Sequence, residues 1–128
     1  MNKKNINRKI TKMALEYCSK KLGLSKYNGE IPTLYISRDK LKGDPRTRGF
    51  YSAETNTIVL YPKAHDSFVD FINTIIHEYV HYTQDLTKYT VLYRSYGYDA
   101  HPQEIEADTV ATKHQWMCKN YIKEKMLK

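Results

Sequence analysis

The segment from Ser67 to Gln84 constrains the fold of this 128-residue chain more than any other segment. At about 100° per residue, one arc of a helix through this segment collects a set of apolar side chains. They are Phe68, Phe71, Ile72, Ile75, Ile76 and Tyr79. Ser67 and Asp70 have the spacing of a capping box, in which the serine side chain accepts a hydrogen bond from the backbone three residues on. We therefore expect a helix that starts after Ser67, runs to about Gln84 and buries one side.

The opposite side of the same helix carries the sequence His77-Glu78-Tyr-Val-His81. Four residues make about one helical turn, so the two imidazoles project together and can bind a single metal ion. Glu78 points across the site, where it can take a proton from metal-bound water. The alternative is a histidine pair that packs or lies exposed without metal. A histidine pair without metal would not require a glutamate beside the first histidine or a further acidic ligand elsewhere in the chain.

A third ligand is required, because catalytic zinc is normally held by three protein side chains and a water. Glu104 and Asp108 are four residues apart on an expected last helix, so they share a face. One of the two carboxylates can bind the metal while the other accepts a hydrogen bond from a ligand histidine, which fixes the histidine tautomer. A metzincin would need glycine at position 84 and histidine at position 87. Gln84 and Thr87 exclude that class.

Glu106 competes with Glu104 for the ligand role, but it lies about 200° around the helix from Glu104. The Glu104 side is expected to face inward, and it includes Ala107, Ala111, Cys118 and Ile122. Small alanines on that side would let two helices approach each other closely. We therefore prefer Glu104. The remaining alternatives are Glu106, His101, His114 or no third protein ligand.

The rest of the chain predicts an α+β fold in a single domain, residues 1–128, because this length suits one compact domain. A first amphipathic helix is expected from Ile6 to Leu22, with Gly23 placed to stop it. Three short strands, a charged loop, a long tyrosine-rich connecting loop and a last helix complete the expected order. The strands are expected at 33–37, 49–53 and 57–61, the loop at 38–48, the connection at 85–101 and the last helix at 102–122.

The composition of the chain indicates the kind of cellular compartment in which the protein is expected. No run approaches the roughly 18 apolar residues that a membrane span requires, so no membrane partner is expected. The basic N-terminal segment lacks the apolar stretch of a secretory signal, which predicts a cytoplasmic protein of the producing or infected cell. In a reducing compartment, Cys18 and Cys118 are expected to be free, buried thiols. A monomer is expected.

The formal net charge is +7, with lysines concentrated near both ends of the chain. We interpret this charge as a solvated surface that keeps a small protein soluble. Nucleic acid is a less favoured partner, because no basic motif interleaved with aromatic residues accompanies the lysines.

The two metal motifs together resemble those of a known family. H-E-x-x-H at 77–81 followed by E-x-x-x-D at 104–108 is similar to the gluzincin pattern. The sequence Pro-Gln-Glu-Ile-Glu-Ala-Asp at 102–108 looks most like that of the compact gluzincin-type metallopeptidases often found in bacteriophages and mobile elements. It is also similar to the E-x-E-A-D/N stretch of ImmA/IrrE-like proteases and the E-x-x-A-D of CAAX-processing peptidases.

This resemblance implies a minimal zincin-like domain with one Zn²⁺ ion and a peptide or protein substrate. It implies that His77, His81 and Glu104 bind the metal, that Asp108 supports the site and that Glu78 acts as the general base. By the same analogy, the strand at 57–61 would be the sheet edge along which a peptide substrate pairs.

The favoured interpretation is therefore a zinc-dependent peptidase. The alternatives are a non-enzymatic binding or structural module that holds a metal on the same fold, and a DNA-associated protease similar in logic to SprT-like proteins. The tyrosine-rich connection contains five candidates for a group that stabilises an oxyanion, Tyr93, Tyr96, Tyr98, Arg94 and His101. The alternative, favoured for any single tyrosine, is that these residues pack the connection over the two helices. His65 is expected to be a surface residue without a partner, and His114 to pack rather than bind.

Overall fold

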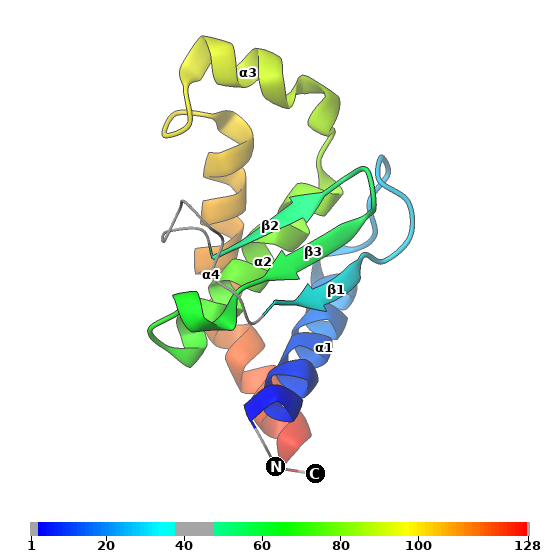
Figure 1. Ribbon diagram of the computed structural model, residues 1–128, viewed down its shortest axis with the longest axis vertical. Helices are drawn as coiled ribbons and strands as arrows, with labels where there is room; N and C mark the ends of the chain where they lie inside the picture. The colour runs from blue at the N-terminus through cyan, green and yellow to red at the C-terminus, as the bar shows by residue number, and fades with distance from the viewer. Residues whose placement is uncertain (1–2, 38–47, 128) are drawn as a thin grey trace.

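The computed structural model of the protein describes residues 3–37 and 48–127. It confirms the α+β class, with four α-helices and a small mixed sheet in the described residues (Figure 1). The helices are α1 (Lys3–Leu22), α2 (Phe68–Thr83), α3 (Tyr89–Tyr96) and α4 (Pro102–Met126). The strands are β1 (Thr33–Ile36), β2 (Gly49–Ser52) and β3 (Thr57–Leu60). Short 3-10 helices occupy Pro62–Ala64 and Leu86–Lys88. The expected charged loop lies outside the described residues except for Arg48.

The sheet has the strand order β1-β3-β2, with β1 parallel and β2 antiparallel to β3. The hairpin between β2 and β3 turns through Asn56, whose φ of 48 is in the left-handed region that asparagine tolerates. β1 then pairs with the other side of β3, with Thr33 opposite Thr57. The expectation that β3 is the edge strand is therefore wrong, because both of its edges are used by neighbouring strands. Among the described strands, β2 keeps one edge unpaired on the hairpin side of the sheet.

Helix α2 lies at the centre of the molecule, between the sheet and the other two long helices (Figure 1). Its apolar arc is buried as expected, and Ile72, Ile75, Ile76 and Tyr79 have no exposed surface. Ile58 and Leu60 of β3 pack against the same core. Burying a side chain of this size stabilises the fold by about 1.5–3 kcal/mol, so the packing of α2 is a main source of the stability of the fold.

The start of α2 follows the expected capping pattern. The Oγ atom of Ser67 accepts a hydrogen bond from the backbone N–H of Asp70 at 3.1 Å. The carboxylate of Asp70 accepts from the backbone N–H of Asp66 and also forms an ion pair with Arg48. The helix ends at Thr83, and Gln84 is extended at its C-cap. Both ends of α2 therefore lie within a residue of their predicted places.

The tyrosine-rich connection is more ordered than the sequence analysis expected. It contains a 3-10 turn followed by helix α3, which ends at Gly97 with a φ of 72. The side chain of Asp85 accepts a hydrogen bond from the backbone N–H of Thr87 and starts this helical segment. Expecting a loop here was wrong, because neither glycine nor proline interrupts residues 86–96. No residue of α3 is buried, and the helix projects from the body of the molecule (Figure 1).

Helix α4 begins at Pro102 as predicted and continues to Met126, four residues beyond the predicted end at Ile122. It packs along α2, with Ala107 and Ala111 fully buried between the two helices. Cys18 and Cys118 are free and have no exposed surface, as expected. In the part of the chain that the structure describes, no helix is both long enough and apolar enough to cross a membrane.

Candidate metal centre

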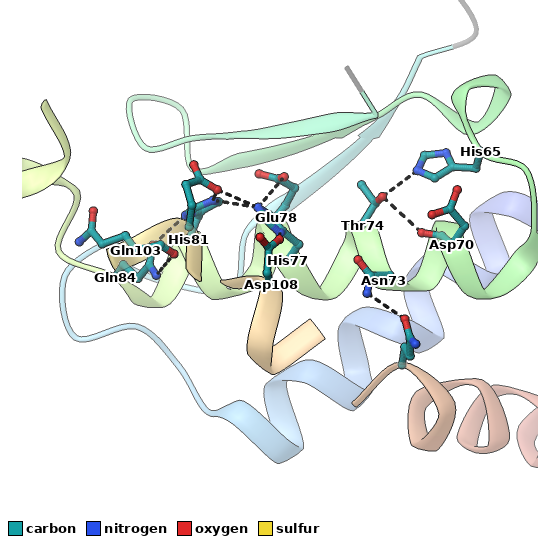
Figure 2. Close-up of polar contacts among 12 residues, drawn as sticks. His65, Asp70, Asn73, Thr74, His77, Glu78, His81, Gln84, Gln103 and Asp108 are labelled. Atoms are coloured by element: carbon teal, nitrogen blue, oxygen red, sulfur yellow. Dashed lines mark hydrogen bonds and ion pairs between the residues drawn. The ribbon is translucent and has the colours of Figure 1, made fainter. Parts of the chain in front are cut away.

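His77, His81 and Glu104 converge on one point between α2 and the first turn of α4. The Nε2 atoms of both histidines lie 3.0 Å from Oε1 of Glu104, and they lie 3.2 Å from each other. Figure 2 shows the two imidazoles turned toward the same point from successive turns of α2. Among residues 3–37 and 48–127, this is the group of three side chains whose ligand atoms are close enough to hold a metal ion.

The convergence follows from how the two helices meet. His77 and His81 are one turn apart on α2, on the side away from its apolar arc. Glu104 lies in the first turn of α4, next to the start of the alanine-lined contact with α2. The side chain of His101 accepts a hydrogen bond from the backbone N–H of Gln103 and forms the N-cap of α4. That cap sets where α4 begins, and so places Glu104 opposite the two histidines.

Each of the three side chains is held at its other polar atom by a further residue. Oδ1 of Asp108 lies 2.9 Å from Nδ1 of His77, as expected (Figure 2). Oε1 of Gln84 lies 2.7 Å from Nδ1 of His81. Acceptors at both Nδ1 atoms favour a proton there, so that with a metal bound the Nε2 lone pairs would be directed at the ion.

The third of these contacts involves a tyrosine that the sequence analysis missed. The hydroxyl of Tyr89 donates to Oε2 of Glu104 at 2.5 Å, which leaves Oε1 to face the histidines. The Tyr89 ring stacks on His101 with 4.0 Å between the ring centroids. Tyr89 reaches Glu104 because α3 leads the chain back to the start of α4, and no local sequence pattern signals that return.

Gln84 is the second residue that the sequence analysis did not assign to the site. Its side chain is buried, and Nε2 donates to the backbone oxygen of Gln103 and to Oε1 of Glu106, both at 2.9 Å. These two bonds identify Nε2 as the amide nitrogen and Oε1 as the acceptor for His81. A glutamine three residues after the second histidine, at the end of its helix, is a signal that could have been used.

The other ligand alternatives lie elsewhere. Glu106 is exposed and accepts from Gln84, outside the group of three. His101 is buried, and its Nε2 lies 3.0 Å from the backbone oxygen of Tyr89. Nδ1 of His114 lies 2.8 Å from the hydroxyl of Tyr17, on the far part of α4. His114 therefore packs, as expected.

Glu78 is 9% exposed, and its Oε2 lies 3.9 Å from Nε2 of His77. Burial raises the pKa of Glu78 to about 7, against the opposing effect of His77 and His81. A backbone hydrogen bond from Tyr51 on β2 also reaches this carboxyl group. Glu78 can therefore both accept and release a proton near neutral pH.

The electrostatics of the group favour a positive charge at the convergence point. Burial by itself would raise the pKa of Glu104, but hydrogen bonds from His77, His81 and Tyr89 more than offset it and hold that pKa well below its usual range. Burial lowers the pKa of both histidines, but the hydrogen bond to Glu104 together with the negative charges of Glu78 and Glu104 outweighs it, so their pKa values are raised. A proton or a metal cation between these side chains is stabilised by the same carboxylate.

A cavity of about 450 Å³ opens onto the group. It is lined by residues of β2, α2, the 3-10 turn after α2, α3, the segment between α3 and α4, and the start of α4. They are Gly49, Phe50, Tyr51, His77, Glu78, His81, Leu86, Tyr89, Tyr98 and Glu104. Of the five oxyanion candidates, the structure brings Tyr98 to this cavity. Tyr93, Arg94 and Tyr96 lie exposed on α3, and His101 is buried behind Tyr89.

The environment of His65 differs from the exposed, unpartnered position that was expected. His65 is partly buried, with Nδ1 3.0 Å from the backbone oxygen of Tyr61 and Nε2 2.8 Å from Oγ1 of Thr74 (Figure 2). Its ring also packs edge-on against Phe71. The prediction of an unpartnered surface histidine was wrong because the 3-10 turn at Pro62–Ala64 leads the chain back over the start of α2.

Comparison of the chain with protein-family models, with curated proteins and with solved structures finds no match. The function is therefore argued from the arrangement of the chain's own side chains.

Proposed function

We propose that this protein is a zinc-dependent peptidase built on a minimal zincin-like fold. In this proposal His77, His81 and Glu104 hold the metal, and Glu78 moves protons during hydrolysis of a peptide bond. The observation that carries the proposal is the position of Glu78. Its carboxyl group is buried in the same cavity as the three candidate ligands, 3.9 Å from Nε2 of His77.

The donor set fits zinc. Two imidazole nitrogens and one carboxylate oxygen are a ligand combination of catalytic zinc sites, which keep a fourth position open. A structural zinc site is closed by four protein ligands. In the described part of the chain three candidate ligands converge, and the adjoining cavity supports a fourth position that is open to water and substrate.

Zinc bound at this point would supply a Lewis acid that polarises a substrate carbonyl and lowers the pKa of a water molecule. Glu78 accepts the proton of the attacking water and returns it to the leaving amine. In this proposal the hydroxyl of Tyr98, which lines the cavity, donates to the developing oxyanion. Burial, together with the nearby carboxylates of Glu104 and Asp108, raises the pKa of Tyr98 to about 12, so that hydroxyl stays protonated at neutral pH.

The unpaired edge of β2 supports a peptide as the substrate. Gly49, Phe50 and Tyr51 line the cavity, and a backbone hydrogen bond joins Tyr51 to Glu78. Among the described strands, β2 pairs with β3 alone. An extended peptide can add to such an edge through its own backbone, which would place a carbonyl beside Glu78.

The test is a Glu78→Gln variant, which keeps the size and polarity of the side chain but removes the base. We expect the variant to fold and to bind zinc as the wild type does. The substrate is a peptide from a library that the wild type cleaves and that it no longer cleaves when a chelator is present. The Glu78→Gln variant should cleave this peptide about 10²–10⁴-fold more slowly. Glu54→Gln, in the exposed turn of the hairpin, is the matched control. Cleavage by Glu78→Gln at the wild-type rate would refute the proposed role.

A second candidate is a recognition module that holds zinc without hydrolysing peptides. The exposed apolar side chains of Val91, Tyr93 and Tyr96 on α3 favour it, because they offer a binding surface near the cavity. Tight zinc binding together with the absence of any zinc-dependent cleavage across the library would support this candidate over the peptidase.

A further inference from the structure

The positive charge of the chain is concentrated in two helical segments. Helix α1 contains seven lysine and arginine residues and one glutamate, and residues 113–125 of α4 contain four lysines and one glutamate. These segments together carry nine net positive charges, which exceeds the +7 of the whole chain. The rest of the protein, including the candidate metal centre, is therefore slightly acidic. We call the two segments together the basic end.

The two segments lie side by side. Nδ1 of His114 lies 2.8 Å from the Tyr17 hydroxyl, and Nζ of Lys20 donates to the Tyr121 hydroxyl at 3.3 Å. Figure 1 shows the later part of α4 beside α1, at the opposite end of the molecule from α3. Of the two acidic side chains in this region, Glu16 is already paired with Lys125 at 3.1 Å. Among the lysines of the basic end whose burial the structure describes, most are exposed and keep their charge available to a partner.

Trp116 lies on the outer face of α4 within the basic end and is 56% exposed. Lys113 and Lys123 are three residues before and seven residues after it, so they lie on the same face. Nζ of Lys119 lies 5.2 Å from the centre of the indole ring. An indole that contributes nothing to the core and is surrounded by three lysines is suited to a partner with both flat rings and negative charges.

We propose that the basic end binds single-stranded nucleic acid, with Trp116 stacking on a base and the surrounding lysines contacting phosphates. Proteins that bind single strands without sequence preference combine an aromatic platform with a cationic surface in this way. This inference goes beyond the proposed peptidase and does not depend on it, because the surface lies more than two turns along α4 from Glu104.

An anionic membrane surface is the competing partner, and the helix face argues against it. Helices that lie in a bilayer interface bury a broad apolar face. The neighbours of Trp116 at three and four residues along α4 are Thr112, Lys113, Lys119 and Asn120. All four are polar or charged, so they do not provide such a face, whereas stacking on a base requires the indole alone.

The experiment measures binding of the full chain to a fluorescently labelled oligothymidylate by anisotropy, at a series of salt concentrations. We expect affinity to fall steeply as salt rises, and tryptophan fluorescence to be quenched on binding. A Lys113→Glu, Lys123→Glu double variant should weaken binding and reduce the slope of log affinity against log salt by about one for each phosphate that the variant no longer neutralises. The matched control is Lys63→Glu, Lys88→Glu, which makes the same charge change at exposed positions outside the basic end.

Trp116→Ala tests the stacking contact separately and, because the side chain is exposed, should leave the fold intact. We expect it to weaken binding by roughly 5- to 150-fold, and Trp116→Phe should retain most of the affinity. Equal losses in the double variant and its control would overturn the proposal, as would wild-type affinity in Trp116→Ala. Binding to vesicles containing phosphatidylserine, abolished in the double variant and without binding to the oligonucleotide, would assign the surface to lipid instead.

Discussion

Asp108 and His77 lie on different helices, with Oδ1 of Asp108 2.9 Å from Nδ1 of His77. Glu104, one turn earlier on α4, approaches the opposite nitrogen of the same imidazole at 3.0 Å. A single helix therefore presents one carboxylate to each side of the His77 ring. The ring orientation is set by α4 as much as by α2, which makes the contact between the two helices part of the site.

We expect Asp108→Ala to weaken zinc binding by about 10–100-fold, the usual effect of removing a group that orients a metal ligand. The Asp108 side chain is 71% exposed, so water can replace part of the missing bond and the effect should lie toward the lower end. Competition with a chromophoric chelator measures the affinity. Thr109→Ala, an exposed neighbour, should bind zinc as the wild type does, and an equal loss in both variants would contradict this role.

Glu104→Ala and Glu106→Ala form a matched pair that tests the choice of third ligand. Removing Glu104 takes away a ligand atom together with the negative charge that both histidines face, so zinc content after purification should fall markedly. Glu106→Ala removes only an acceptor of Gln84 and should leave the zinc content nearly unchanged. Elemental analysis decides, and an empty site in Glu106→Ala alone would show that Glu106 is the ligand.

Tyr89→Phe should lower zinc affinity while leaving the fold intact. The substitution removes the hydrogen bond to Oε2 of Glu104 but keeps the ring that stacks on His101. A hydrogen bond to a charged group contributes about 1.5–3 kcal/mol, and part of that should appear as weaker binding of zinc measured by calorimetry. Tyr93→Phe removes an exposed hydroxyl of the same helix and serves as the control. Identical affinities in the two variants would rule out an orienting role for Tyr89.

We expect the stability of the fold to depend on pH through His65, which lies outside the candidate metal centre. Burial lowers the pKa of His65 below its usual value of 6.5, so the folded state binds the proton less readily than the unfolded state. The contribution of neutral His65 is therefore fully present above about pH 6.5 and is lost as the pH falls through the folded-state pKa. Urea unfolding at neutral pH and at about pH 5 should show a smaller loss on acidification for His65→Gln than for the wild type. Parallel losses would show that His65 does not titrate with folding.

The elements that the sequence predicted well are those in which local pattern and tertiary packing agree. Ser67 caps α2, the apolar arc of α2 is buried, and Pro102 begins α4, because each depends on residues within one or two helical turns. The group formed by His77, His81 and Glu104 was also predictable, since two motifs with helical spacing leave few other ways to bring three ligand atoms together.

The parts that were missed depend on the path of the chain between elements. Tyr89 reaches Glu104 only because residues 86–96 are helical, whereas a loop was expected there. The position of β3 in the middle of the sheet depends on β1 crossing to its far side, which no residue in β3 signals. The partners of His65 depend in the same way on a short turn that folds back over α2.

The reactivity of the two buried cysteines, Cys18 on α1 and Cys118 on α4, should report how often these helices separate. Burial raises the pKa of Cys118 to about 12 and raises that of Cys18 well above its usual range, so neither is a reactive thiolate in the closed molecule. A thiol reagent can modify them only while the helices are apart, and the labelling rate then measures the population of that open state. Glu104 also lies on α4, so an ion bound between α4 and α2 should hold α4 in place and slow the labelling of the cysteines. The labelling rate would then report metal binding even when no substrate is known.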